Sequence, residues 1–295
     1  MSEFKTVAII GRYETPDLVQ PIVELAKALE SYEYNVIFNT ETANEIGFPE
    51  LGFPLRDRLS RRDGRNIATD ADVVIVIGGD GTMLGVAREV APFGLPLIGV
   101  NRGRVGFITD IPLNDMIHEV FKILSGKYVR EKRAMLTTEV VRDEKVVFSS
   151  HALNDVTVTR GGISGMVELR ASVDGQFMYE LRADGLIVST PTGSSAYSLS
   201  AGGPLLHPRL RSVVITPVAP QQLTHRSIVL PGDSNVEITI VGGENINVHS
   251  DMQMYAALRI GDIVRVTRSA HVAPFLHPEG HDHYATLRQK LHWAE

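Results

Sequence analysis

Asp80 lies at the centre of the stretch GGDGT, residues 78–82, which directly follows five residues that are all Val or Ile. Such a run is typical of a strand covered on both faces of a parallel sheet. The apolar residues after Thr82 recur at helical spacing. We therefore predict a strand that ends at this loop and a helix that begins there, which is where open α/β sheets bind ligands.

The composition of this loop indicates contact with an anion. Gly78, Gly79 and Gly81 let a backbone approach a ligand closely, and the N–H groups at a helix start favour phosphate. A carboxylate there repels phosphate, so Asp80 needs a task of its own: accepting a proton from a hydroxyl, or helping to hold a metal ion. An Asp-Gly turn without chemistry is the alternative. The glycines spell neither GxxxxGK[ST] nor GxGxxG, which excludes two common nucleotide-binding loops.

Hydroxyl groups are dense in a second stretch, RADGLIVSTPTGSSAYSLSAGGP, residues 182–204. A predicted strand feeds a loop that carries Ser189, Thr190, Thr192, Ser194 and Ser195. Such a loop at the start of a short helix binds phosphate or ribose through neutral donors, and a serine-rich capped turn is the alternative. Neither TGSSAY nor GGISGM spells GxSxG, so nucleophilic serine catalysis is not indicated.

Two shorter motifs leave their interpretation open. Asn154 and Asp155 interrupt a β-like run, HALNDVTVTR, and mark either a turn or bulge or a contact with ribose hydroxyls or an adenine edge. Arg102 and Arg104 in NRGRVGF follow another predicted strand and either face phosphates or belong to a solvated loop.

Three histidines in HPEGHDHY, His277, His281 and His283, resemble a metal-binding cluster. The Pro and Gly between them predict an irregular surface tail without a fixed ligand face. We therefore expect no functional metal site in this segment.

The composition is that of an ordinary globular protein. The 295 residues suffice for two domains, and a net charge of −6 without a basic tract argues against nucleic acid as the main partner. The chain has no cysteine, which excludes disulfides and thiolate chemistry. Because neither a long apolar span nor a signal peptide is visible, we expect a cytoplasmic protein without a membrane partner.

The order of strand and helix signals predicts an α/β domain followed by a mostly β domain. In residues 1–125, strands such as TVAII and NVIF alternate with amphipathic helices, an order typical of βαβ units. Residues 126–274 contain short β-like runs separated by Gly, Asn and Asp turns. The tail, residues 275–295, carries a helical pattern, YATLRQKLHW, whose apolar residues need a surface, and we predict that it packs back on the first domain.

GGDGT, LND at 153–155 and DGLIVSTPTGSSAYSLSAGGP at 184–204 together resemble the bacterial NAD kinases of the ATP-NAD kinase family, in the same order and spacing. Diacylglycerol kinases, sphingosine kinases and phosphofructokinases carry loops similar to GGDGT, whereas the long serine-rich stretch is typical of NAD kinases. Ser195 stands where many members have threonine, and Asp155 where many have glutamate. Both differences keep the hydroxyl or the carboxylate.

The resemblance implies a Rossmann-like α/β domain, a β-sandwich-like domain and a site in the cleft between them. It implies transfer of the γ-phosphoryl group of ATP to the 2′-hydroxyl of the adenosine ribose of NAD, which yields NADP, with a divalent cation, expected to be Mg²⁺. Asp80 is then similar to a general base, while Gly78, Gly79, Gly81 and Thr82 accommodate phosphates. No protein residue is assigned as a metal ligand.

The same resemblance implies the contacts with NAD. Asn154 and Asp155 look like contacts at the nicotinamide end and the ribose. Arg182 and Asp184 look like residues that reach a bound NAD, in some members from a neighbouring subunit of a dimer or tetramer. The remaining implied contacts are Thr192, Ser195, Ala196, Tyr197, Ser198, Leu199, Ser200 and Gln253.

Two alternatives to an NAD kinase stay open. A lipid kinase of the diacylglycerol type shares the GGDGT loop but does not explain the serine-rich stretch. A non-catalytic dinucleotide-binding regulator keeps the Gly and Ser loops but needs no acid at position 80.

Overall fold

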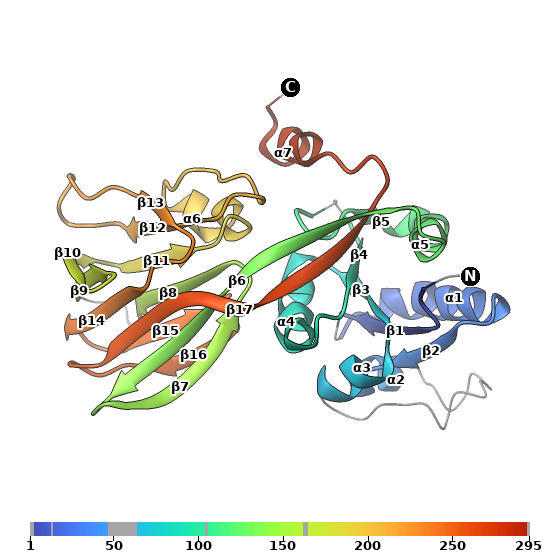
Figure 1. Cartoon of the computed structure of the whole chain (residues 1–295), viewed down its shortest axis with the longest axis horizontal. Coiled ribbons are helices and arrows are strands. Elements are labelled where there is room, and N and C mark those ends of the chain that lie inside the picture. The colour runs from blue at the N-terminus through green and yellow to red at the C-terminus, as the bar shows by residue number, and fades with distance from the viewer. Residues whose placement is uncertain (1–2, 13, 47–63, 104–105, 162–164, 294–295) are drawn as a thin grey trace. The chain divides into compact units, whose positions relative to one another are not determined.

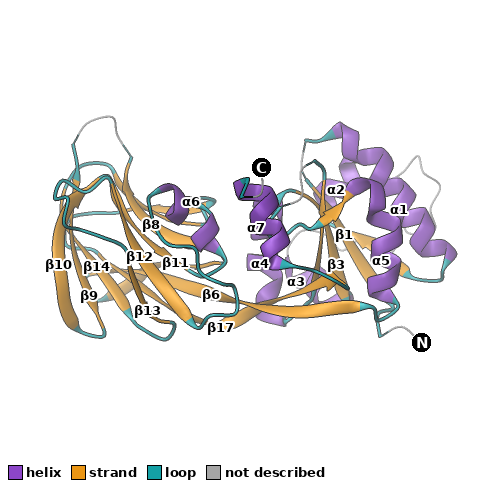
Figure 2. Cartoon of the chain, turned by 90° about the horizontal axis from the view of Figure 1, so that it is seen from above, coloured by secondary structure: helices purple, strands orange, loops and turns teal. Residues whose placement is uncertain are grey.

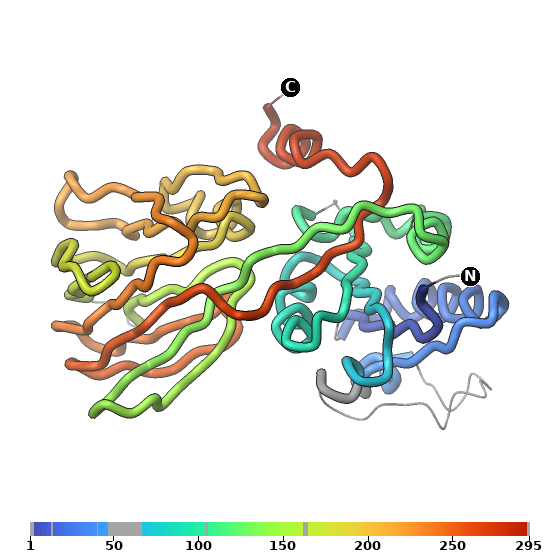
Figure 3. Tube along the Cα trace, in the orientation of Figure 1, coloured from blue at the N-terminus to red at the C-terminus, as the bar shows by residue number. Residues whose placement is uncertain are grey.

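The computed structural model describes residues 3–12, 14–46, 64–103, 106–161 and 165–293 of the chain. The chain divides into two compact units, Met1–Lys132 together with Ala273–Glu295, and Arg133–Val272. β6 (Tyr128–Arg142) leads from the first unit into the second, and β17 (Ile263–Pro278) leads back, as the trace in Figure 3 shows. The sequence places these divisions after residues 125 and 274.

A parallel sheet in the order β4-β3-β1-β2 forms the centre of the first unit (Figure 1). Its strands are β1 (Thr6–Gly11), β2 (Asn35–Phe38), β3 (Val73–Gly78) and β4 (Leu97–Asn101), with β5 (Ile111–Pro112) paired to β4. Gly11 pairs with Ile77, and Gly78 pairs with Asn101. The carboxyl ends of β1, β3 and β4 therefore lie at one edge of the sheet.

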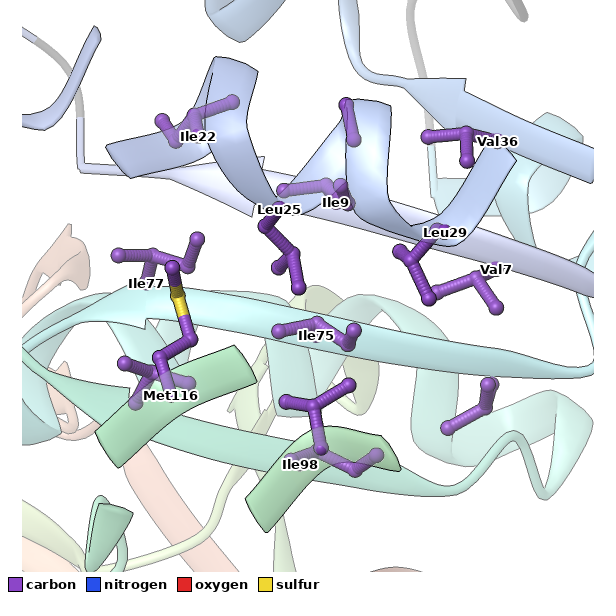
Figure 4. Close-up of a cluster of buried hydrophobic side chains, with 14 of the residues drawn as sticks. Val7, Ile9, Ile22, Leu25, Leu29, Val36, Ile75, Ile77, Ile98 and Met116 are labelled. Atoms are coloured by element: carbon purple, nitrogen blue, oxygen red, sulfur yellow. The ribbon is translucent and has the colours of Figure 1, made fainter. Parts of the chain in front are cut away.

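α1 (Val19–Ser31) and α5 (Met116–Leu124) cover one face of this sheet. Ile22, Leu25 and Leu29 recur at spacings of three and four, so they share one side of α1. Figure 4 shows these side chains packed against the strands, with Ile9 of β1 and Ile75 of β3 facing them. All five side chains are buried.

α4 (Asp80–Val90) covers the opposite face, beside α3 (Gly64–Asp70). Ile98 of β4 belongs to the core under α1, so Gly99, the next residue, faces the other way. A Cβ atom at Gly99 would lie 2.9 Å from Cε of Met83 in α4. Figure 2 shows α1 and α5 on one side of β1 and β3, and α3 and α4 on the other.

The remaining helices are short, and two of them have polar side-chain caps. α2 (Thr40–Glu45) follows Asn39, whose side chain accepts a hydrogen bond from the backbone N–H of Thr42. α7 (His283–Leu291) follows Asp282, whose side chain accepts one from the backbone N–H of Tyr284. α6 spans Tyr197–Ser200, and 3₁₀ helices span Pro16–Leu18, Ala91–Phe93, Leu113–Asp115 and Gly193–Ser195.

The second unit is a sandwich of antiparallel strands. One layer has the order β10-β9-β14-β17 and also contains the β6-β7 pair; the other has the order β13-β12-β11-β8-β15-β16. Alternate residues of both layers, such as Leu169 and Ile238 in one and Val158 and Val188 in the other, share one buried core. The strands not yet given are β7 (Lys145–Ala152), β8 (Asp155–Arg160), β9 (Val167–Val173), β10 (Gln176–Ala183), β11 (Gly185–Ser189), β12 (Ser212–Val218), β13 (Ile228–Pro231), β14 (Val236–Gly242), β15 (Ile246–Ser250) and β16 (Met254–Ala257).

The architecture confirms the fold class predicted from the sequence: a Rossmann-like unit, a β-sandwich-like unit and a tail that joins the first unit. Phe275 of β17 pairs with Leu97 of β4, which attaches the tail to the parallel sheet. The run 145–160 is not one strand, because the chain bends at Leu153 and Asn154 between β7 and β8. The turn interpretation of this motif is therefore correct for the backbone.

Candidate functional site

Asp80 is the first residue of α4, and a single residue separates it from the end of β3. Gly79 is the N-cap of the helix and connects the two elements. A Cβ atom at Gly78 would lie 2.7 Å from Oγ1 of Thr82, so the connection can be this tight only with glycine. The negative side chain lies at the end of the helix where the macrodipole is positive.

The carboxylate of Asp80 is bound by a loop that follows β4. It accepts hydrogen bonds from the backbone N–H groups of Phe107 (2.8 Å) and Ile108 (3.3 Å) and from the hydroxyl of Thr109 (2.8 Å). The side-chain amide of Asn101 donates to the same hydroxyl of Thr109 at 2.8 Å. Because Thr109 accepts from Asn101, its proton points to Asp80, and the position of the carboxylate is fixed.

Two glycines permit this close approach of the loop. A Cβ atom at Gly106 would lie 2.0 Å from Oδ1 of Asp80 and 2.4 Å from Oγ1 of Thr109. One at Gly99 would lie 2.5 Å from the carbonyl oxygen of Ile108. The loop from 106 to 109 therefore packs directly on β4 and on the carboxylate.

A carboxylate held in this way keeps acceptor capacity. Its two oxygens offer about four lone-pair sites, and three donors occupy part of them. Asp80 is half-buried, so solvent or a ligand reaches it. The group can therefore accept a proton from a hydroxyl or contribute one oxygen to a hydrated cation.

Arg102 of the neighbouring NRGRVGF motif forms an ion pair with Asp17 on the surface of the first unit. Its side chain is 44% exposed, and that of Asp17 is 71% exposed. Arg104 lies outside the described residues. The structure thus places Arg102 in a solvated ion pair.

In the second unit, Asp251 organises the turn that contains Asn154 and Asp155. Its carboxylate accepts hydrogen bonds from the backbone N–H groups of Asn154 (2.7 Å), Leu153 (3.0 Å) and Asp155 (3.3 Å). Asp251 and Met252 both have positive φ, 51° and 55°, a conformation that Asp tolerates better than most residues. This turn carries the predicted NAD contacts, and Asp251 was not among the residues predicted from the sequence.

Asp155 is buried beside this second carboxylate. It is 3% exposed, and within the described residues its Oδ1 atom has no hydrogen-bond partner. Burial, together with the negative charge of Asp251, raises the pKa of Asp155 to about 7. Near neutral pH the group is therefore partly protonated and can donate a hydrogen bond as well as accept one.

The serine-rich loop is fastened to the same turn. The backbone N–H of Thr190 donates to the carbonyl of Asn154 at 2.8 Å, and its hydroxyl donates to the carbonyl of Leu153 at 2.6 Å. A Cβ atom at Gly193 would lie 2.1 Å from the carbonyl oxygen of Asn154. The two motifs, some 40 residues apart in the chain, are one local structure.

Several hydroxyls of this loop stabilise the loop itself. Ser194 donates to the carbonyl of Pro191 at 2.7 Å and accepts from the backbone N–H of Leu206 at 2.9 Å. Ser198 is fully buried and shares a hydrogen bond of 3.0 Å with Thr216. The capped-turn interpretation thus accounts for these two serines.

Other members of the loop lie nearer the surface. Ser195, Ala196, Tyr197 and Leu199 are half-buried, and Ser200 is exposed.

Thr192 is buried, and its hydroxyl accepts a hydrogen bond of 3.3 Å from the guanidinium of Arg133, which is 3% exposed. Arg133 was not predicted as a site residue, since no motif surrounds it.

The other predicted NAD contacts of this unit lie on its surface. Arg182 of β10 forms an ion pair of 3.1 Å with Glu168 of β9. Asp184 forms one of 2.9 Å with Arg160 of β8. Gln253 is exposed in the turn between β15 and β16.

The prediction of an irregular surface tail around His277 and His281 is wrong. His277 belongs to β17 and is 1% exposed, because the strand continues past Phe275 along the parallel sheet. The Nδ1 atoms of His277 and His281 lie 2.9 and 2.8 Å from one carboxylate oxygen of Asp110. His283 is the first residue of α7 and does not belong to this cluster.

The charge of Asp110 is stabilised by the two imidazoles. Burial alone raises the pKa of a carboxyl group, but the hydrogen bonds that Asp110 shares with His277 and His281 outweigh burial and hold the pKa of Asp110 well below its usual range. Sequence reasoning missed Asp110, which lies 167 residues from His277 along the chain.

The chain matches known proteins over its whole length. It fits the model of the ATP-NAD kinase N-terminal domain over residues 7–128 and that of the ATP-NAD kinase C-terminal domain over residues 153–277. It is 52% identical over 294 residues to the NAD kinase of Burkholderia ambifaria (strain MC40-6), covering 100% of this chain and 95% of the relative. The NAD kinase of Paraburkholderia phymatum is 50% identical over the same shares of the two chains.

Solved structures show the same fold. The crystal structure of yeast NADH kinase in complex with NADH matches with a TM-score of 0.89 and 26% identity, over 99% of this chain and 88% of that one. An NAD kinase from Archaeoglobus fulgidus in complex with ATP matches with a TM-score of 0.74 and 24% identity, over 97% and 98%. This chain belongs to the ATP-NAD kinase family. None of the helices in the described part of the chain has the length and apolarity to span a membrane.

The contact at Gly106 predicts the effect of a single methyl group. In Gly106→Ala the new methyl would overlap the carboxylate of Asp80, so the carboxylate or the loop must move, and we expect turnover to fall by about 100-fold. Gly103→Ala is the matched control, because its methyl would meet no atom within 4 Å. Unchanged turnover in Gly106→Ala, measured beside this control with circular dichroism to verify folding, would contradict the fixed geometry of Asp80.

The pKa of Asp155 predicts a pH dependence of stability. The folded protein holds this proton up to about pH 7, whereas an unfolded chain releases it near pH 4. Between these values the folded state binds more protons, so the free energy of unfolding decreases as the pH rises, on the order of 2–4 kcal/mol. In Asp155→Asn this contribution disappears, so the free energy of unfolding, measured with urea at pH 5 and pH 8, should decrease less than in the wild type.

Asp233→Asn is the control, because Asp233 is exposed. An equal decrease in Asp155→Asn and in the wild type would refute the raised pKa of Asp155.

Proposed function

We propose that this protein transfers the γ-phosphoryl group of ATP to the 2′-hydroxyl of the adenosine ribose of NAD, with Asp80 as the general base. As a member of the ATP-NAD kinase family it is a kinase that phosphorylates NAD. The observation that carries the proposed role of Asp80 is its half-buried carboxylate, fixed by three donors where β3 passes into α4.

Phosphoryl transfer requires the protein mainly to position the two substrates and to stabilise charge. A ribose hydroxyl is a weak nucleophile, and a carboxylate within hydrogen-bond reach raises its reactivity by accepting the proton. Phosphoryl transfer depends otherwise on alignment of the two substrates and on stabilisation of the phosphate charge. Gly78, Gly79 and Gly81, with the backbone N–H groups at the start of α4, are proposed to receive the phosphates.

Mg²⁺ is proposed to enter with ATP as part of the substrate. Such ions keep several waters and bind through one or two carboxylates and the phosphates, and the acceptor capacity left on Asp80 fits that pattern. When bound, Mg²⁺ neutralises charge on the phosphates.

We propose that the dinucleotide binds at the turn of Asn154 and Asp155, at Thr192 and at the partly exposed residues of the serine-rich loop. The two motifs are one hydrogen-bonded local structure, and Tyr197 offers a ring among small hydroxyl donors. Gly193 and Ser198 support this structure from within. The residues proposed to face NAD are Asn154, Asp155, Thr192, Ser195, Ala196, Tyr197, Leu199, Ser200 and, at the periphery, Gln253.

The direct experiment offers the purified protein ATP and Mg²⁺ with either NAD or a diacylglycerol. We expect ATP-dependent formation of NADP, detected with an NADP-specific dehydrogenase, and no phosphorylated lipid. Phosphorylated lipid without NADP would support the lipid kinase instead. Binding of NAD without any phosphorylation would support the non-catalytic regulator. The family membership does not favour either alternative.

We further propose a cytoplasmic homo-oligomer, a dimer or tetramer, in which Arg182 and Asp184 reach the NAD of a neighbouring subunit. Both side chains lie on the surface and carry charges suited to a polar ligand. Their present partners, Glu168 and Arg160, are also near the surface, so the ion pairs cost little to rearrange.

Asp80→Asn keeps the shape of the side chain but removes its basicity. We expect kcat to fall by about two to four orders of magnitude, the range for a positioned general base, while the fold stays intact. Titration of the variant with Mg²⁺ distinguishes a general base from a metal ligand. If Asp80 mainly holds the metal, excess Mg²⁺ should partly restore the activity of Asp80→Asn. Turnover close to that of the wild type would refute the assignment of the base.

Subunit mixing tests the shared site. Asp80→Asn and Asp184→Ala proteins, each expected to be inactive, are combined under conditions that let subunits exchange. If the site is shared, some mixed interfaces unite an intact Asp80 with an intact Asp184, and a fraction of the activity returns. No recovery despite exchange verified by mass spectrometry, or full activity in a monomer, would rule out the shared site.

A further inference from the structure

Asp110, His277 and His281 form a cluster of metal-ligating side chains that the proposed phosphoryl transfer does not use. Asp110 directly precedes β5, His277 lies near the end of β17, and His281 lies between β17 and α7. All three belong to the first unit. Their potential ligand atoms lie within 4.8 Å of one another.

The geometry of the cluster brings two nitrogens to one oxygen. The Nδ1 atoms of His277 and His281 lie 2.9 and 2.8 Å from the same Oδ2 atom of Asp110. The imidazole rings stack at 4.0 Å with an interplanar angle of 16°, and both Nδ1 atoms approach the same carboxylate oxygen. Two neutral imidazole nitrogens and a carboxylate oxygen that converge in this manner are a familiar set of ligands for a divalent transition metal.

The second oxygen of the carboxylate supports the same interpretation. Asp110 is 9% exposed, and its Oδ1 atom has no hydrogen-bond partner in the part of the chain that the structure describes. A buried carboxylate oxygen without a partner costs free energy. A cation bound between Asp110 and the two imidazoles would compensate that cost.

Glu131 supplies the outer partner that such a site requires. Its Oε2 atom lies 3.3 Å from Nε2 of His277, on the side of the ring that faces away from Asp110. Histidines that bind a metal through one nitrogen commonly donate the other N–H to a carboxylate, which fixes the tautomer and the ring. Phe275 stacks on the ring of His277 at 6.0 Å and 11°, which shields the site with an apolar wall.

We propose that Asp110, His277 and His281 bind one divalent transition-metal ion, with Zn²⁺ the best fit, and that Glu131 orients His277 from outside. Mg²⁺ and Ca²⁺ prefer sets of oxygen ligands, whereas His nitrogen with carboxylate oxygen suits Zn²⁺. Three protein ligands leave a fourth position for water. The ion joins Asp110 beside the parallel sheet to the segment that precedes α7, so it fastens the C-terminal tail to the first unit.

The test measures binding of Zn²⁺ alone. Protein without a polyhistidine tag is stripped with a chelator, dialysed and titrated with Zn²⁺ against a chromophoric chelator, and bound metal is counted by mass spectrometry after gel filtration. The variants are His281→Gln, Asp110→Asn and Glu131→Gln. His283→Gln and His118→Gln are the controls, since neither residue belongs to the cluster and His118 is 72% exposed.

We expect one Zn²⁺ per chain in the wild type and both controls, with a higher thermal midpoint when the metal is bound. Glu131→Gln should weaken binding by about 10- to 100-fold, and the two ligand variants by more. Co²⁺ added in place of Zn²⁺ should give the visible absorption of a four-coordinate ion in the wild type and lose it in His281→Gln.

Wild-type protein that takes up no Zn²⁺, or a His281→Gln variant that binds it as tightly, would overturn the proposal and leave a hydrogen-bonded Asp-His-His clamp. If Asp110→Asn fails to fold, His281→Gln carries the test, because its side chain is 13% exposed and at the edge of the cluster. The titration contains neither NAD nor ATP, so its outcome is independent of the proposed kinase activity.

Discussion

The position of the Asp80 carboxylate depends on the close packing of the loop 106–109 against β4 of the parallel sheet. β3 is buried along its whole length, and its last residue, Gly78, lies at the carboxyl-terminal edge of the sheet. Asp80 follows after a single connecting residue. Its side chain would be free to rotate if the loop from 106 to 109 did not bind it. That loop approaches because Gly99 and Gly106 have no side chains in the way. The fold thus supplies an immobile acceptor at the start of a helix, and electrostatic catalysis requires such preorganisation.

Buried carboxylates have three different roles in this chain. Asp251 accepts three backbone N–H groups and thereby shapes the turn at Asn154. Asp155, its neighbour, lacks such donors for Oδ1 among the described residues, and its pKa is raised. Asp110 is held between two histidines. The difference lies in the donors that surround each group, since burial without donors favours the neutral acid and burial with donors favours the anion.

Local patterns in the sequence predicted much of the fold and part of the site. The Val and Ile run before GGDGT and the helical spacing after it located β3 and α4, because both signals depend only on neighbouring residues. The same is true of the loop after β11. The donors to Asp80, and Asp251 beneath the turn, were not predicted, because their partners lie 27 to 98 residues away and no motif links them.

The error at His277 has the same origin. Pro278 and Gly280 are typical of an irregular tail when only the neighbouring residues are considered. Pairing of Phe275 with Leu97 overrides that tendency and buries His277 beside Asp110. Tertiary contacts of this kind decide the outcome wherever the local signal is weak.

A double-mutant cycle between Asp80→Asn and Thr109→Val, measured on kcat for NADP formation, tests most directly whether the loop acts by holding the carboxylate. Thr109→Val replaces the hydroxyl that donates to Asp80 and accepts from Asn101 with a methyl group of similar size. We predict a 10- to 100-fold loss, about the contribution of a hydrogen bond to a charged group, in the background with Asp80 and little further loss in Asp80→Asn. Equal losses in both backgrounds would contradict the account, because Thr109 would then act independently of Asp80.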